Sequence, residues 1–340
     1  MADSPRAVTY RAGDALAVRP TNATALVDEW FAVTGWDPEQ LVAVDGRAVA
    51  LRAALTDELD ITRVSRDLLA VVAEHGGSPE LRRMLRPDGG TDLARWTWCR
   101  QAVDVVAELA PDVPATALVG ALRRLAPRQY SISSSPRVTP CTVSLTMSVV
   151  RYASPSGAAR GGVCSTFLAD APTGTVVPVH VQASAHFHPP AADVPAIMIG
   201  PGTGVAPFVG FLADRAAAGH TGRNWLFFGE QHAATDFYYR DELSAMLADG
   251  RLDRLDTAFS RDQRAKVYVQ DRMREHGGRV WEWLESGASV FVCGDASRMA
   301  RDVDTALRDV VVTHGGLTRD AADAYVKDLT TTRRYVRDVY

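Results

Sequence analysis

The strongest constraint on the fold is a regular alternation of apolar runs and helical spacing from Pro195 onward. Each short apolar run predicts a strand, and each is followed by a segment with the hydrophobic periodicity of a helix. The predicted strands are Ala196–Ile199, Trp225–Phe228, Leu255–Phe259 and Val290–Cys293. Strands that alternate with crossover helices predict a parallel sheet of the nucleotide-binding kind.

The preceding part of the chain has a different pattern. A short strand pattern lies within residues 10–20, and helical spacing then extends over about 22–125. Strand-like runs follow at 129–133, 142–152 and 175–182, separated by turn residues. We therefore expect two domains, one at 1–190 with a helical insertion at about 22–125, and one at 191–340.

Composition and charge exclude several classes of protein. With 37 basic and 41 acidic residues, the net charge of −4 gives no electrostatic footprint for nucleic acid or an anionic membrane. The uncharged residues 194–213 contain several prolines and glycines, which argues against a membrane span. The four cysteines have neither a CxxC spacing nor a neighbouring histidine cluster, so we expect no disulfide and no metal. The first residues lack the apolar segment of a signal peptide, which predicts a cytoplasmic protein.

Two segments beside the predicted parallel strands are suited to phosphate. Residues 199–207, IGPGTGVAP, would let backbone N–H groups approach a pyrophosphate, although a tight turn alone is the alternative. Residues 260–270, SRDQRAKVYVQ, place three cations after a strand, where an arginine distinguishes a 2′-phosphate from a bare ribose. Lys266 stands out because the chain has only one other lysine. A solvated basic face is the alternative to a phosphate site at 260–270. Glu230, after the second predicted strand, would instead favour NAD over NADP.

Two further segments in the first half favour a flavin nucleotide. Arg128 and Tyr130 lie two residues apart on a predicted strand and therefore point the same way, one towards a phosphate and one towards a flat ring. Residues 162–166, GVCST, predict the start of a helix, where N–H groups and hydroxyls can bind a pyrophosphate.

The ordered set RQYS, GVCS, GPGTGVAPF, SRDQRAKVYVQ and VCGD, with a terminal aromatic residue, resembles the diflavin reductase branch of the ferredoxin–NADP reductase family. The segments NWLFFG, AFSRDQ and RRYVRDVY resemble in particular the flavoprotein subunits of NADPH-dependent sulfite reductases. The resemblance covers essentially the whole chain. It implies an antiparallel FAD-binding β-barrel with a helical connecting insertion, followed by a Rossmann-like parallel-sheet NADPH domain.

The resemblance also implies FAD and NADPH as cofactors, together with their binding residues. Those implied for FAD are Thr62, Arg128, Tyr130, Ser131, Thr146, Met147, Ser148, Tyr152, Gly162, Val163, Cys164 and Ser165. Those implied for NADPH are Thr203, Ser260, Arg261, Lys266, Val267, Tyr268, Val269, Gln270 and Asp302. The catalytic trio would be Ser131, Cys293 and Asp338, along the hydride path. Tyr340 would stack on the flavin, with a frayed terminus as the alternative.

The function implied is electron transfer from NADPH through FAD to an FMN-containing flavodoxin or FMN domain, within assimilatory sulfite reduction. A sulfite reductase haemoprotein subunit would be a further partner. The alternatives are the reductase arm of a nitrate reductase or cytochrome P450-type system, and a degenerate nucleotide-binding subunit. The family's FMN domain and first barrel strand have no counterpart in the sequence, so we expect another polypeptide or a truncated start.

Overall fold

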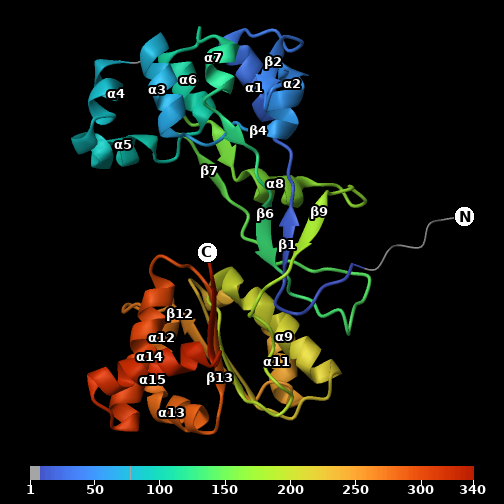
Figure 1. Ribbon diagram of the computed structural model, residues 1–340, viewed down its shortest axis with the longest axis vertical. Helices are drawn as coiled ribbons and strands as arrows, with labels where there is room; N and C mark the ends of the chain where they lie inside the picture. Colours follow the sequence, from blue (N-terminus) through green and yellow to red (C-terminus); the bar gives the residue numbers. More distant parts are fainter. Residues whose placement is uncertain (1–7, 77) are drawn as a thin grey trace, which may run out of the picture. The chain divides into compact units, whose positions relative to one another are not determined.

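The computed structural model describes residues 8–76 and 78–340, and the chain forms two compact units (Figure 1). The first unit contains the residues up to Leu16, Gln129–Met147 and Val181–Tyr340. The second unit contains Ala17–Arg128 and Ser148–His180. Each unit is therefore built from stretches that are distant in the sequence. The expectation that a barrel strand is missing ahead of Tyr10 concerns residues 1–9, of which 1–7 lie outside the described residues.

A five-stranded parallel sheet forms the centre of the first unit, in the order β12-β11-β10-β13-β14. Its strands are β10 (Ala196–Ile199), β11 (Asn224–Glu230), β12 (Arg254–Phe259), β13 (Ser289–Gly294) and β14 (Tyr335–Val339). The four predicted strands are confirmed, with small extensions at their ends. β14 is an addition that the alternation of strands and helices did not predict.

Helices cover both faces of this sheet. In Figure 1, α9 and α11 lie on one face and α12 to α15 on the other. The strand side chains alternate between the two faces: Ile197 and Ile199 pack with α12–α15, whereas Ala196 and Met198 pack with α9 and α11. The helices are α9 (Ala206–Ala217), α10 (Ala233–Asp236), α11 (Arg240–Ala248), α12 (Val269–Glu275), α13 (Gly277–Glu285), α14 (Met299–Gly315) and α15 (Arg319–Thr331).

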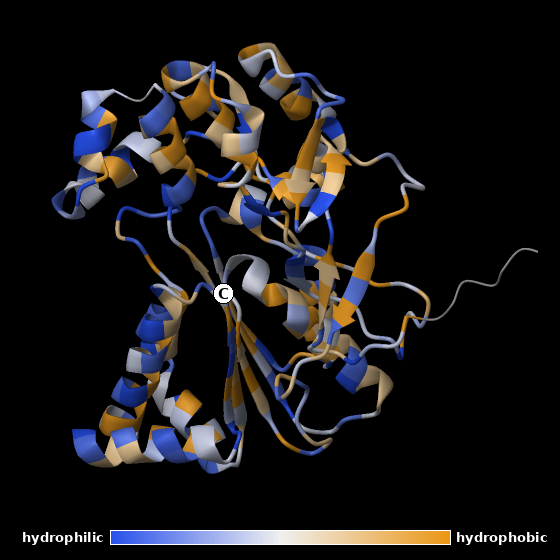
Figure 2. Cartoon of the chain, turned by 45° about the horizontal axis from the view of Figure 1, so that its top comes forward, coloured by the Kyte–Doolittle hydropathy of each residue, from blue (hydrophilic) through white to orange (hydrophobic). Residues whose placement is uncertain are grey.

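The second unit contains the helical insertion. Its helices are α1 (Thr24–Thr34), α2 (Leu51–Ala53), α3 (Arg66–His75), α4 (Pro79–Met84), α5 (Gly90–Thr97), α6 (Ala102–Leu109) and α7 (Ala115–Val119). These helices carry both hydrophobic and hydrophilic residues, as Figure 2 shows. Their apolar sides bury Trp30, Leu51, Leu68 and Val103 in one core. Ser65 and Ser78 accept hydrogen bonds that cap the starts of α3 and α4.

The insertion also contains a hairpin that helical spacing did not predict. Its strands are β2 (Leu41–Val44) and β3 (Arg47–Ala50), which pair antiparallel. The two turn residues between them, Asp45 and Gly46, have φ values of 52° and 74°. Positive φ at both central residues is the geometry that tight hairpins prefer, and Asp-Gly is a favoured sequence for it.

The strands outside the parallel sheet are short. β1 (Ala15–Val18), β6 (Arg128–Ser131) and β9 (Val179–Gln182) form a three-stranded sheet in the order β6-β1-β9. β4 (Leu59–Asp60) pairs antiparallel with β5 (Arg123–Arg124), and β7 (Arg151–Ala153) pairs antiparallel with β8 (Ala159–Gly161). The predicted strand at 142–152 is therefore wrong over most of its length, because only an isolated bridge from Leu145 precedes β7. Likewise, only the end of the run at 175–182 is a strand.

The uncharged stretch 194–213 folds as β10, a 3₁₀ turn and the start of α9. Within the residues that the structure describes, no helix has the length and apolar character needed to cross a membrane.

Candidate functional site

A cavity of about 440 Å³ lies in the first unit where β11 and β12 end and the glycine-rich segment after β10 begins. Ligands of open α/β sheets bind at this edge, beyond the carboxyl ends of the strands. The predicted NADPH residues that line it are Ser260, Arg261, Lys266, Tyr268, Val269, Gln270 and Asp302. Val267 does not line the cavity and packs instead against the core under α12–α15.

The cations of this cavity are available to an anion. Arg261, Lys266 and Arg298 line it, and all three are exposed. Among residues 8–76 and 78–340, no carboxylate lies within ion-pair distance of these three side chains. A phosphate fits such a donor set, because it can accept charge-assisted hydrogen bonds from each cation. Arg298 was missed from the sequence, where it stands apart from the 260–270 cluster.

The cationic loop is held against the end of β11. The backbone N–H groups of Ser260 and Arg261 donate to the carbonyls of Glu230 and Gln231 at 2.8 and 2.9 Å. The Asp262 carboxylate accepts from the Ala233 N–H at 2.9 Å, and its other oxygen lies 3.0 Å from Nδ1 of His232. The Ala233 N–H, and then His232, hold the pKa of Asp262 below its ordinary value. The loop is thereby fixed beside the cavity.

Two glycines of the 199–207 segment are required by close packing. A Cβ on Gly204 would lie 2.2 Å from the carbonyl oxygen of Cys293, and one on Gly200 would lie 2.5 Å from the carbonyl oxygen of Gly204. The segment therefore lies against the end of β13. Thr203 does not line the coenzyme cavity, and its hydroxyl pairs with the Tyr340 hydroxyl at 3.1 Å.

The predicted catalytic trio is brought together. β13 and β14 pair in parallel with Cys293 opposite Asp338. Oδ2 of Asp338 accepts from the Ser131 hydroxyl at 3.3 Å and lies 4.0 Å from Sγ of Cys293. Burial, and then the Asp338 carboxylate, raise the pKa of the Cys293 thiol. Burial also raises the pKa of Asp338, although the Ser131 hydrogen bond opposes this.

Tyr340 is held in place rather than frayed. Its backbone N–H donates to the carbonyl of Gly294 at 3.1 Å, and its carbonyl accepts from Ala296 at 3.0 Å. The residue as a whole is nevertheless 65% exposed, although burial at its hydroxyl end raises the pKa of that group. An exposed aromatic ring on an ordered backbone can stack on a flat ligand.

Among the predicted FAD residues of the first unit, Tyr130 lies on β6 beside Ser131, and Thr146 and Met147 lie in the segment after Leu145. The Thr146 hydroxyl hydrogen-bonds to the hydroxyl of Tyr239. Tyr239 has a φ of 57°, a left-handed conformation that is uncommon for a bulky residue. No local sequence pattern identified Tyr239.

In the second unit, a buried carboxylate connects two predicted FAD residues. Asp60 accepts from the hydroxyl and backbone N–H of Thr62 at 2.7 and 3.1 Å. Its other oxygen accepts from the Arg128 guanidinium at 3.3 Å. Asp60 was missed from the sequence, because its partners are separated from each other by more than sixty positions.

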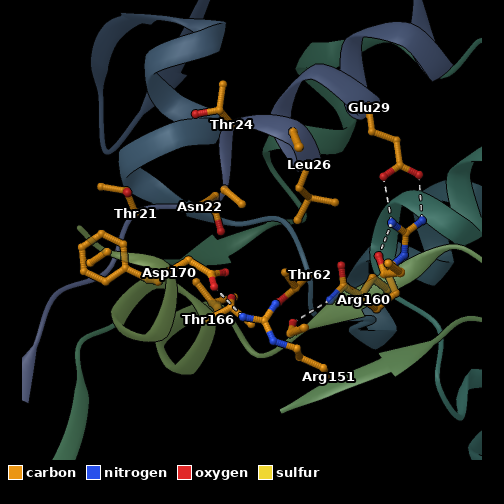
Figure 3. Close-up of a pocket in the computed structure, with 18 of the residues that line it drawn as sticks. Thr21, Asn22, Thr24, Leu26, Glu29, Thr62, Arg151, Arg160, Thr166 and Asp170 are labelled. Atoms are coloured by element: carbon orange, nitrogen blue, oxygen red, sulfur yellow. Dashed lines mark hydrogen bonds and ion pairs between the residues drawn. The ribbon is translucent and has the colours of Figure 1, made fainter. Parts of the chain in front are cut away.

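The predicted pyrophosphate segment forms the first turn of α8 (Val163–Asp170), with Gly162 as its N-cap. The Ser165 hydroxyl accepts from the Val150 N–H at 3.2 Å. Beside this turn lies a second cavity, of about 560 Å³, crossed by the Arg151–Asp170 and Arg160–Glu29 ion pairs (Figure 3). The predicted residues that line it are Thr62, Tyr152 and Val163. Those that do not are Arg128, Ser148, Gly162, Cys164 and Ser165.

Comparison with known protein families assigns both halves of the chain. Residues 1–167 match the model of an FAD binding domain, and residues 198–305 match that of an oxidoreductase NAD-binding domain. The chain therefore contains an FAD binding domain and an oxidoreductase NAD-binding domain. The prediction of FAD and NADPH as cofactors of this oxidoreductase is confirmed at the level of these two domains, whereas the individual binding roles stay predictions.

Relatives resemble this oxidoreductase over nearly all of its length. It is 41% identical over 338 residues to the sulfite reductase [NADPH] flavoprotein alpha-component of Bacillus subtilis (strain 168), covering 98% of the chain and 56% of the relative. It is 42% identical over 336 residues to the protein of that name from Shewanella sp. (strain MR-4), covering 97% and 55%. The chain thus spans about half the length of the curated relatives it matches.

Proposed function

We propose that this oxidoreductase takes electrons from NADPH through FAD and passes them to an FMN-containing flavodoxin or FMN domain, as part of sulfite reduction. The names of its relatives support sulfite reduction, with a sulfite reductase haemoprotein as the further partner. The cytoplasmic location predicted from the sequence is part of this proposal, and the four cysteines are free thiols, which is compatible with it.

The observation that carries the proposal is the unpaired cationic lining of the coenzyme cavity. Arg261 and Lys266 would bind the 2′-phosphate of NADPH, which is the group that distinguishes it from NADH. Glu230, which also lines the cavity, lies beside this loop and could accept a hydrogen bond from a ribose hydroxyl. The single Glu230 carboxylate favours NADH less strongly than the cations lining the same cavity favour NADPH.

The residues near the end of β13 suit the chemistry of this proposal. When bound, FAD supplies a ring that accepts a hydride from nicotinamide and releases electrons singly. The raised pKa of Cys293 keeps its thiol protonated at neutral pH, so Sγ can donate to Asp338. Asp338 would hold Ser131 and Cys293 in a fixed orientation, and the exposed Tyr340 ring would cover the flavin until nicotinamide enters.

NADPH oxidation by the purified 340-residue chain, with and without an added flavodoxin, tests the proposal. We expect a yellow protein that NADPH bleaches and that reduces ferricyanide quickly. Cytochrome c or a sulfite reductase haemoprotein should be reduced well only when the flavodoxin is present. Fast reduction of haem without the flavodoxin would contradict the FMN relay, and a colourless protein would indicate a nucleotide-binding subunit.

A further inference from the structure

A buried set of polar contacts in the second unit connects the helical insertion to β8. Arg160 of β8 is 8% exposed, yet its guanidinium is fully paired. Nε and Nη2 donate to Asp104 at 3.1 and 2.6 Å. Nη1 and Nη2 donate to Glu29 at 2.8 and 2.7 Å (Figure 3). Glu29 lies on α1 and Asp104 on α6, so two helices of the insertion hold one strand residue.

Gln101 provides a second connection from the start of α6. Its side chain is 3% exposed and donates from Nε2 to the carbonyl of Gly161 at 2.9 Å. A capping box orients this side chain, because it accepts from the Asp104 N–H while the Gln101 N–H donates to Oδ2 of Asp104 at 2.7 Å. Asp104 therefore holds both Gln101 and Arg160.

The residues held in this way lead directly into α8. A Cβ on Gly161 would lie 2.5 Å from Cγ2 of Thr166, and one on Gly162 would lie 2.8 Å from the Ser165 hydroxyl. The Gly161-Gly162 backbone thus lies against the first turn of the helix. Because the glycine backbone and the first turn of α8 are in close contact, a shift of Gly161 would move that turn. The position of Gly161 therefore determines where the N–H groups of the turn lie.

We propose that Glu29, Gln101, Asp104 and Arg160 are positioning residues for FAD. We call these four residues the clamp. It holds the Gly161-Gly162 turn so that the first turn of α8 meets the pyrophosphate in the geometry for binding. This inference rests on the proposed function, in which that turn binds FAD. It gives the helical insertion a part in retaining the cofactor, besides its own packing.

Gln101→Met tests the clamp, because methionine keeps the length and burial of the side chain but has no N–H donor. We expect FAD to leave this holoprotein about tenfold faster than it leaves the wild type, because the buried contact with Gly161 is lost together with the side-chain half of the capping box. Flavin fluorescence after dilution measures the release. Glu29→Gln keeps one of the two acceptor oxygens for Arg160, which also stays bound to Asp104, and should give a smaller increase.

Two controls separate positioning from general loss of structure. Arg83→Met removes an exposed ion pair with Asp92 on the same insertion and should release FAD at the wild-type rate. The affinity for 2′-AMP, which we assign to the coenzyme cavity of the first unit, should be unchanged in every variant.

FAD release at the wild-type rate from both Gln101→Met and Glu29→Gln would overturn the clamp. Faster release accompanied by equally weakened 2′-AMP binding and a lower Tm would also overturn it, because that pattern indicates general destabilisation. Both outcomes leave the proposed function standing. A wild-type chain that held no FAD would overturn the proposed function and the clamp together.

Discussion

In the coenzyme cavity of the first unit, half of the polar side chains come from the continuous stretch 260–270, and the cations that line the cavity are exposed. In the clamp of the second unit, the paired residues are 131, 60 and 56 positions apart, and the groups are mostly buried. Both regions are assigned to a dinucleotide. The cations of the coenzyme cavity have no carboxylate partner among the described residues and can bind a ligand. The charges of the clamp are already paired with one another.

This difference teaches which property each region controls. An exposed, unpaired cation contributes to stability chiefly when a ligand is bound, so its removal should alter affinity and leave the fold intact. A buried pair must be complete, because removal of one partner leaves an uncompensated charge in a medium of low dielectric. The cavity should therefore respond to substitution through coenzyme choice, and the clamp through stability and FAD retention.

The largest expected effect comes from Asp104→Ala, which leaves Arg160 half paired in the core. We expect the free energy of unfolding to fall by about 3–5 kcal/mol, measured by urea titration. Asp92→Ala, which breaks an exposed pair with Arg83, should cost about 1 kcal/mol or less. Equal effects of the two substitutions would remove the distinction between buried and exposed pairs.

Arg261→Ala should have the next largest effect, and on coenzyme choice alone. A charge-assisted contact to the 2′-phosphate is worth about 1.5–3 kcal/mol, so the KM for NADPH should rise about tenfold or more. The KM for NADH and the free energy of unfolding should hardly change. Arg264→Ala is the matched control, since Arg264 shares the exposed loop but does not line the cavity. Equal losses with NADPH and NADH would contradict the assignment.

Deletion of Tyr340 should have a smaller effect. Nicotinamide must displace the Tyr340 ring, whose stacking and one hydrogen bond together contribute about 1 kcal/mol. NADPH offsets this cost through its 2′-phosphate contacts and NADH does not, so the deletion should improve the NADH rate relative to the NADPH rate roughly fivefold. The flavin absorption band should also shift. Tyr340→Phe, which loses only the contact with Thr203, should leave both measurements close to the wild type. An unchanged coenzyme ratio after the deletion would argue against stacking.

Asp338→Asn should have the smallest of these effects, a gain in stability whose size depends on pH. Burial raises the pKa of Asp338 in the folded protein, so the folded state holds a proton that the unfolded state releases. The wild type therefore loses stability as the pH rises from the ordinary carboxyl pKa through the raised one, and the asparagine variant does not. Urea titrations at pH 4 and pH 7 should show a gain of about 1 kcal/mol or less, confined to pH 7. A gain of equal size at pH 4 would exclude this origin.

The parallel sheet was predictable because its strands are buried on both faces and therefore read as uninterrupted apolar runs. The 142–152 run was predicted as a strand from its β-branched residues, but Val149 and Val150 are exposed and lie outside any strand. The turn chemistry of Asp45-Gly46 was available in the sequence, yet the helical spacing on either side outweighed it. β-propensity and helical spacing report only the local preference of a segment. Its pairing with other segments in the fold decides which secondary structure it adopts.

The cationic half of the candidate site was predictable for a related reason, since a strand end followed by a donor-rich loop is a local signal. The meeting of Cys293 with Asp338 depended on β14, and only the family resemblance pointed to it. Glu29, Gln101, Asp104 and Arg160 carry no local signal at all. Each is an ordinary polar residue of a helix or strand until the fold buries it beside its partners.

The interleaving of the two units has a consequence for how such a gene can be rearranged. The chain passes from one unit to the other after Leu16, Arg128, Met147 and His180. A recombination break between Glu29 and Arg160 would place mismatched halves of the clamp in one protein. A break near residue 180 also divides the first unit, but it leaves the clamp whole. The stretch from Val181 onward contains β10 to β14 and every residue that lines the coenzyme cavity. We therefore expect viable chimaeras of related reductases to exchange this last stretch as a block. Recombination should then transfer coenzyme preference between related proteins more often than it transfers the residues that retain the flavin.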